Sequence, residues 1–290
     1  MMHVSRPHHS HAVRLADGRT LAIDELGHPS GTPVVFLPSA PGSRRIDPDP
    51  DATMRACVRL LSVDRPGFGA SSPVPEGVIP TIASMTDDVA AALSTLGVDR
   101  FAVIGWSAGG RVALGLASRA AGNVTSVAIV GTPAPEEEVP WMPAEYRETT
   151  RALRADPASA LSKLRSSLDA MTAEPTSAIR GIGRGASDER ALQDPHIVAT
   201  LEVMLREGLK TADGVAADIV AGVVVPWGID LSTITAPVAC FYGEDDRIAP
   251  PAHGAWYASK LRHATVRLFP EAGHLLPLTH WDEVLAAVVP

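Results

Sequence analysis

Short apolar runs recur along most of the chain and alternate with segments of helical periodicity. Runs of this kind predict strands that are covered on both faces, as in a parallel sheet. They occupy residues 34–37, 60–63, 101–104, 127–130, 238–242 and 266–269. Before them, residues 13–23 alternate in polarity around Asp17-Gly18, which predicts an antiparallel hairpin. Together these segments predict a doubly wound, mostly parallel eight-stranded α/β sheet.

Helical patterns fill several of the intervals between the strands. Apolar residues at helical spacing run through residues 85–96 and stop before Gly97, and a second such pattern covers residues 281–288. In a doubly wound sheet, ligands bind outside the carboxyl ends of the strands. We therefore expect the functional site at that edge.

The alternation is interrupted once. Roughly a hundred residues separate the runs 127–130 and 238–242, which is too many for a simple crossover. Helical patterns around residues 161–171 and 197–205 predict an inserted helical cap at 136–233, in a core made of 1–135 and 234–290. The Gly- and Ser-rich segment 176–188 is predicted to be a flexible loop within the cap.

Composition and charge narrow the class of protein. With 46% hydrophobic and 20% charged residues, the chain is neither disordered nor fibrous. Its formal charge of −8 argues against a nucleic-acid binder, and no stretch approaches the roughly 20 apolar residues that span a membrane. We expect a cytoplasmic monomer or homodimer that acts on a small molecule, without nucleic-acid or membrane partners.

The strongest local motif is Gly-Trp-Ser-Ala-Gly at residues 105–109. It directly follows the run 101–104 and precedes a helical stretch at 111–121. A strand, a sharp turn and a helix place Ser107 on a strained elbow at the carboxyl end of the strand. The pattern arises by chance in many chains, but this context makes chance a poor explanation. A serine hydroxyl still needs a base and an orienting acid.

Candidates for both follow in the order that such an elbow requires. Asp245 and Asp246 lie in the turn after the run 238–242, and His274 lies in a Gly-containing loop after the run 266–269. Alone, a carboxylate after a strand is usually a turn former and a single histidine is usually structural. Three complementary groups at one sheet edge favour catalysis.

These motifs resemble the α/β-hydrolase superfamily, specifically its capped serine-dependent members, over almost the whole chain from His11 to Pro290. Residues 64–71, Asp-Arg-Pro-Gly-Phe-Gly-Ala-Ser, resemble the family's D-x-x-G-x-G-x-S turn, for which we expect a structural role. The resemblance implies Ser107 as nucleophile, Asp246 as acid with Asp245 as its rival, and His274 as general base. It implies no metal and no organic cofactor.

One loop departs from the family pattern. Acyl transfer needs backbone N–H donors for the oxyanion, and the resemblance implies Ala108 and Ala40 as these donors. The family's His-Gly-x-Pro is replaced here by Pro-Ser-Ala-Pro at residues 38–41. Neutral drift in a working esterase and lost or altered chemistry both explain the change, and the intact triad favours drift.

Three further groups of residues each allow two interpretations, one functional and one structural. Aromatic and Met side chains predict either an apolar substrate pocket or plain helix packing: Trp106, Trp141, Met142, Tyr146, Met171, Met204 and Trp227. The histidines of the N-terminus, His3, His8, His9 and His11, predict a mobile tail rather than a metal site. Glu136, Glu137 and Glu138 predict a solvated helix start rather than a site for a substrate's amine.

The sequence as a whole predicts a carboxylesterase-like serine hydrolase that works through an acyl-enzyme on a small to medium apolar substrate. The same residues would also serve carbon–carbon bond hydrolysis, peptidase action, perhydrolysis or a biosynthetic tailoring step. From a different class, a ligand-binding protein with negligible turnover would keep the pocket, and Pro38-Ser39 motivates that alternative.

Overall fold

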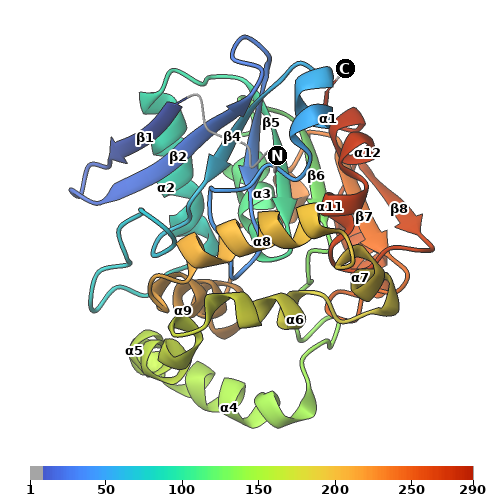
Figure 1. The fold of residues 1–290 in the computed structure, drawn as a ribbon. Helices are drawn as coiled ribbons and strands as arrows, with labels where there is room; N and C mark the ends of the chain where they lie inside the picture. Colours follow the sequence, from blue (N-terminus) through green and yellow to red (C-terminus); the bar gives the residue numbers. More distant parts are fainter. Residues whose placement is uncertain (1–8, 290) are drawn as a thin grey trace.

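One eight-stranded sheet organises the computed structural model, which describes residues 9–289 (Figure 1). The strand order is β1-β2-β4-β3-β5-β6-β7-β8. β2 runs antiparallel to β1 and β4, and the remaining neighbours are parallel, as predicted. The strands are β1 (His9–Arg14), β2 (Thr20–Gly27), β3 (Thr32–Leu37), β4 (Val58–Val63), β5 (Phe101–Trp106), β6 (Val124–Val130), β7 (Val238–Gly243) and β8 (Ala264–Phe269).

Helices flank the sheet on both faces (Figure 1). Those outside the segment between β6 and β7 are α1 (Pro50–Arg55), α2 (Ile82–Thr95), α3 (Ala108–Arg119), α10 (Ala252–Lys260), α11 (Leu276–Thr279) and α12 (Trp281–Ala286). α2 begins with a capping box between Thr81 and Ser84, which satisfies N–H groups that the first turn leaves free. None of the helices in residues 9–289 is long and apolar enough to cross a membrane.

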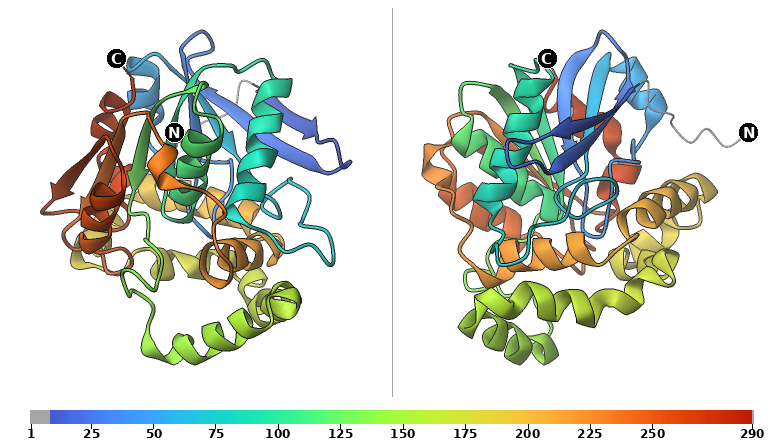
Figure 2. Two further views of the ribbon diagram at one scale, coloured as in Figure 1. Left: turned by 180° about the vertical axis from the view of Figure 1, so that it is seen from behind. Right: turned by 90° about the vertical axis from the view of Figure 1, so that its left-hand side faces the viewer.

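The chain between β6 and β7 is helical, as the interrupted alternation predicts. It contains α4 (Ala144–Ala155), α5 (Pro157–Leu168), α6 (Ile179–Ile182), α7 (Ala186–Ala191), α8 (Pro195–Gly208), α9 (Asp213–Ile219), the 3-10 turns η1 (Asp169–Thr172), η2 (Pro175–Ala178) and η4 (Leu231–Thr233), and the π-helical turn η3 (Val220–Val224). We call residues 136–233 the inserted segment; its status as a separate cap domain stays a prediction. Figure 2 shows α4 on its outer side, far from the strands.

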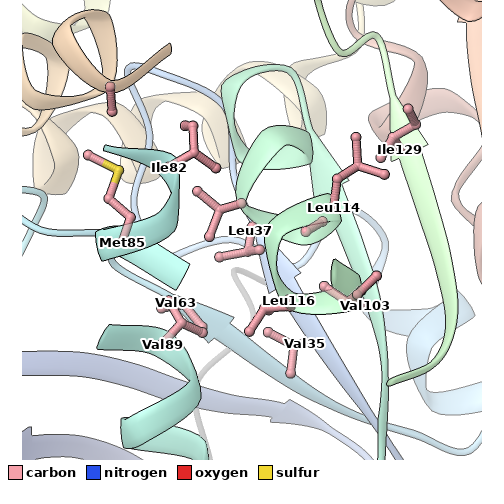
Figure 3. Packing of buried hydrophobic residues seen from close by; sticks show 14 of the residues in the cluster. Val35, Leu37, Val63, Ile82, Met85, Val89, Val103, Leu114, Leu116 and Ile129 are labelled. Carbon is pink, nitrogen blue, oxygen red and sulfur yellow. The ribbon is translucent and has the colours of Figure 1, made fainter. Parts of the chain in front are cut away.

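Side-chain alternation divides the core between the two faces of the sheet. Val35 and Val103 face α2 and α3, where they meet Val89 and Leu116 (Figure 3). The next residues along β3 and β5 point to the opposite face and join α1, α8 and α12. Trp106, the last residue of β5, belongs to this second face.

Two expectations about the ends of the chain were wrong. β8 is not covered on both faces: it is the last strand of the sheet, paired with β7, and most of its side chains are exposed, with Val266 and Leu268 at 37% and 48%. His9 and His11 belong to β1 rather than to a tail, and the His11 ring lies 2.8 Å from a carboxylate oxygen of Glu25. His3 and His8 lie outside the described residues.

Two expectations about the inserted segment were also wrong. Residues 176–188 are not a loop, because they contain most of η2, all of α6 and the start of α7, and Asp188 is buried there among backbone N–H groups. The three glutamates at 136–138 form a turn rather than a helix start. The Glu136 carboxylate accepts the N–H groups of Trp141 and Met142, and α4 begins only at Ala144.

Candidate active site

Ser107 occupies a sharp turn between β5 and α3. Its backbone angles, φ 55° and ψ −122°, lie in a region that non-glycine residues rarely adopt, which marks the strained elbow that the motif predicts. The tight turn needs Gly109, because a Cβ there would lie 2.1 Å from the carbonyl oxygen of Leu37. The same contact brings the start of α3 against the end of β3.

His274 and Asp246 form a buried pair at the ends of β8 and β7. Nδ1 of His274 lies 2.8 Å from Oδ2 of Asp246. The other carboxylate oxygen of Asp246 accepts the N–H groups of Ile248 and Ala249, both at 2.8 Å. Both oxygens of the carboxylate therefore accept hydrogen bonds. Because Nδ1 of the imidazole binds Asp246, Nε2 is the ring nitrogen that faces away from the acid.

The charge of Asp246 acts on the acid–base behaviour of His274. Burial by itself favours the neutral imidazole, but the nearby carboxylate and its hydrogen bond outweigh burial and raise the pKa of His274 above its usual range. Asp188 adds a smaller effect in the same direction. The site therefore stabilises the imidazolium that a general base becomes when it takes a proton.

Asp245 points elsewhere. Its carboxylate accepts the N–H of Ser187 at 2.7 Å and pairs with Arg247. The hydrogen bond from Ser187, followed by the interaction with Arg247, lowers the pKa of Asp245. Of the two rival acids, only Asp246 is bonded to the histidine.

Gly131, directly after β6, connects the elbow with the acid–histidine pair. A Cβ on Gly131 would lie 3.1 Å from both Asp246 Oδ2 and His274 Nδ1, and the preceding residue, Val130, accepts the N–H of Ser107 at 2.8 Å. The three predicted residues therefore gather around the end of β6. No hydrogen bond joins the Ser107 hydroxyl to another residue of 9–289, a contact that often forms only when substrate binds.

The loop at 38–42 lies beside the elbow and is braced by a residue from another turn. Ala40 and Ala108 are partly exposed, whereas Pro38, Ser39 and Ser107 are buried. Arg65 donates to the carbonyl oxygens of Pro38 and Ser39, at 2.5 and 3.1 Å. The Arg65 guanidinium thus holds the backbone of this loop through two carbonyl oxygens.

Arg65 is itself held by the inserted segment. Asp218 of α9 forms a bidentate ion pair with it, and both side chains are buried. Arg65 belongs to the turn 64–71, for which a structural role was expected. Gly67 and Gly69 do take positive φ there, and the Asp64 carboxylate accepts the N–H of Ala70.

The predicted substrate residues do not gather at one place. Trp106 is fully buried below the elbow, and its indole N–H donates to the carbonyl oxygen of His274 at 2.9 Å, so it supports the histidine loop. Trp141 and Met142 lie in the turn before α4, and Tyr146 on α4 is 57% exposed. Of the other candidates, Met204 is buried on the face of Trp106, Met171 packs against that face, and Trp227 packs against the opposite one.

Sequence reasoning missed two residues next to the site, Arg65 and Asp188. Asp188 accepts the backbone N–H groups of His274 and Leu275. A charged residue inside a Gly-rich turn is the one local signal that pointed to Arg65, and nothing local distinguished Asp188. Within the described chain, no three His, Cys, Asp or Glu side chains come together as a metal site would require.

Comparisons with known proteins find relatives with esterase and hydrolase names. Pimeloyl-(acyl-carrier protein) methyl ester esterase of Chromobacterium violaceum is 29% identical over 243 residues, 81% of this chain and 83% of that protein. A 2-hydroxy-6-oxononadienedioate/2-hydroxy-6-oxononatrienedioate hydrolase of a Pseudomonas species is 23% identical and covers 91% of this chain and 88% of its own.

A similar fold is seen in a solved structure and in a family model. The structure of a hydrolase from Pseudomonas aeruginosa superimposes with a TM-score of 0.71 at 24% identity, over 98% of each chain. The family model described as alpha/beta hydrolase fold matches residues 32–280. The chain therefore belongs to the alpha/beta hydrolase fold family.

Proposed function

We propose that this protein is a serine hydrolase that cleaves a carboxylic ester, or a related acyl bond, of a small to medium apolar substrate. The observation that carries the proposal is the buried His274–Asp246 pair, which lies against the end of β6 together with the strained Ser107. A nucleophile, a base and an orienting acid are the groups that acyl transfer needs.

In the proposed reaction, Nε2 of His274 removes the proton of the Ser107 hydroxyl as Oγ attacks the substrate carbonyl carbon. The N–H groups of Ala40 and Ala108 stabilise the oxyanion of the tetrahedral intermediate. When the carbonyl reforms, the ester C–O bond breaks, the leaving alcohol takes the proton from His274, and the acyl group stays on Ser107. Water then attacks this ester with His274 again as base, which releases the acid and restores the serine.

The hydrogen bonds from Arg65 to the loop at residues 38–42 favour a catalytic function over a ligand-binding protein without turnover. Pro38-Ser39 stands where the family has His-Gly, and Arg65 donates to the carbonyl oxygens of both of these residues. A second candidate is hydrolysis of a carbon–carbon bond, which the same three residues would serve. Relatives named 2-hydroxy-6-oxononadienedioate/2-hydroxy-6-oxononatrienedioate hydrolase, whose substrates are not simple esters by name, align with most of the chain. The relatives named as methyl ester esterases favour the ester.

The test compares the wild-type protein with Ser107→Ala and with Ser162→Ala, which changes an exposed serine of α5. Each is treated with a fluorophosphonate probe and with short-chain p-nitrophenyl esters. We expect labelling and turnover in the wild type and in Ser162→Ala, and neither in Ser107→Ala. Ester turnover that survives Ser107→Ala would refute the serine mechanism. A wild type that neither labels nor turns over would indicate the binding protein instead.

A further inference from the structure

An acidic side chain of the inserted segment lies against the loop that carries the catalytic histidine. Asp188 of α7 is 1% exposed. Its Oδ2 accepts the backbone N–H of His274 at 3.1 Å, and its Oδ1 accepts that of Leu275 at 2.9 Å. Oδ2 also accepts the N–H groups of Arg184 and Gly185, at 3.2 and 3.4 Å. One carboxylate thus binds backbone groups from two segments far apart in sequence.

The contact is close enough to exclude a side chain at the neighbouring position. A Cβ on Gly273 would lie 2.4 Å from the carboxyl carbon of Asp188. Glycine before His274 therefore allows the carboxylate to reach the backbone of the loop. On the other side, the N–H of Ser187 donates to Asp245, in the turn that also carries Asp246. Ser187 and Asp188, adjacent residues of α7, therefore contact the turn that carries Asp246 and the loop that carries His274.

A buried carboxylate is costly unless its oxygens are satisfied, and here backbone donors satisfy both of them. Such charge-assisted bonds fix the path of the histidine backbone. Rates of acyl transfer depend steeply on the position of the base, since a displacement of about 1 Å costs about 10²-fold. The negative charge also favours the protonated imidazole, in addition to the larger effect of Asp246.

We propose that Asp188 is a positioning residue for His274, which holds the histidine loop in register with Asp246 from within the inserted segment. This proposal rests on the proposed serine-hydrolase function, in which His274 is the general base. The inserted segment then contributes to the rate of the chemical step.

The variant Asp188→Asn tests this role, because it keeps the size of the side chain but replaces one accepting oxygen by an NH₂ group. Asp194→Asn is the matched control, since it removes the same charge from an exposed helix cap nearby. We expect Asp188→Asn to lower kcat by about 10-fold or more with little change in KM, and to move the acidic limb of the kcat/KM profile to lower pH. A folded Asp188→Asn with wild-type kcat and pH profile would overturn the proposal.

Two measurements test the role of Asp188 whether or not Ser107 is the nucleophile. NMR titration of the His274 imidazole is carried out in the Ser107→Ala background, with and without Asp188→Asn. A lower pKa in the double variant supports the role of Asp188 even if Ser107 proves unreactive, and an unchanged pKa opposes it. If Asp188→Asn does not fold, amide hydrogen exchange of the wild-type protein tests whether Asp188 holds the loop of His274. Protection of the His274 and Leu275 amides comparable to that of α7 is expected, and exchange at the rate of an open loop would contradict it.

Discussion

The Asp246 carboxylate, and not that of the adjacent Asp245, lies 2.8 Å from the His274 ring. We expect Asp246→Asn to reduce kcat by about 10³–10⁴-fold, because the amide no longer stabilises the imidazolium or selects the required tautomer. Steady-state kinetics on a p-nitrophenyl ester measures this effect.

Asp245→Asn serves as the matched control, because it changes the same group one position earlier. It removes only the bond from Ser187 and the pair with Arg247, so kcat should fall less than about 10-fold. Equal losses in the two variants would show that the whole turn, rather than one carboxylate, supports the histidine.

The pH dependence of the reaction follows from the raised pKa of His274. A general base must be neutral, so kcat/KM should rise with pH through the pKa of His274 in the free enzyme. Because the folded protein raises that pKa, the acidic limb should lie above the ordinary histidine value of about 6.5. A kcat/KM profile between pH 4 and 9 measures it, and a limb below pH 6 would contradict the electrostatic role of Asp246.

The variant Arg65→Met tests whether Arg65 supports the loop at residues 38–42, which carries the proposed oxyanion donor Ala40. Losing both bonds to the Pro38 and Ser39 carbonyls should lower kcat about 10- to 100-fold, which is less than losing an oxyanion donor itself. The variant also leaves Asp218 buried without its partner, at a cost of about 3–5 kcal/mol in the free energy of unfolding.

A second substitution separates these two effects. Adding Asp218→Leu to Arg65→Met removes the unpaired charge, so the double variant should recover much of the stability but little of the kcat. Urea denaturation and ester kinetics on the same preparations measure both quantities. Recovery of kcat together with stability would mean that Arg65 acts only through folding.

Asp47, before α1, gives a prediction about stability alone. Burial raises the pKa of its carboxyl to about 7, and one of its oxygens has no hydrogen-bond partner among residues 9–289. As the pH falls from 8 to 5, Asp47 takes up a proton in the folded protein, whereas in the unfolded chain it does so only near pH 4. Asp47 therefore makes the free energy of unfolding larger at pH 5 than at pH 8.

We therefore expect Asp47→Asn to raise the free energy of unfolding by about 2–4 kcal/mol at pH 8 and by little at pH 5. Urea denaturation at the two pH values measures the difference. Asp99→Asn, at an exposed position between α2 and β5 that does not act on Asp47, should change neither value. A stabilisation that is the same at both pH values would exclude the ionised carboxylate as its cause.

The features that could be predicted are those that local sequence determines. The sheet follows from apolar runs such as 101–104, because a strand between two layers of helices must be apolar on both faces. Ser107 follows from its neighbours, because only small residues permit the turn. Positions after consecutive strands point to His274 and to the pair Asp245 and Asp246, and the family resemblance favours Asp246 of the two.

The features that could not be predicted depend on neighbours that are distant in sequence. The apolar run at β8 does not reveal that the strand has one neighbour instead of two. Arg65 and Asp218 are 153 residues apart, and Asp188 and His274 are 86 apart, so no spacing rule connects them. The segment 176–188 has the composition of a loop, but it is helical, and its Asp188 binds backbone N–H groups within the segment and in the loop of His274.

Two of the ties that join the inserted segment to loops at the sheet edge, from Asp188 to the His274 loop and from Asp218 to Arg65, divide that segment by its tolerance of mutation. α7 and α9 carry Asp188 and Asp218, so we expect substitutions there to lower turnover of every substrate. α4 buries only Thr150 and Leu153 and carries neither tie. Natural divergence and laboratory libraries that alter selectivity without loss of turnover should accumulate their changes in α4, while α7 and α9 stay nearly invariant.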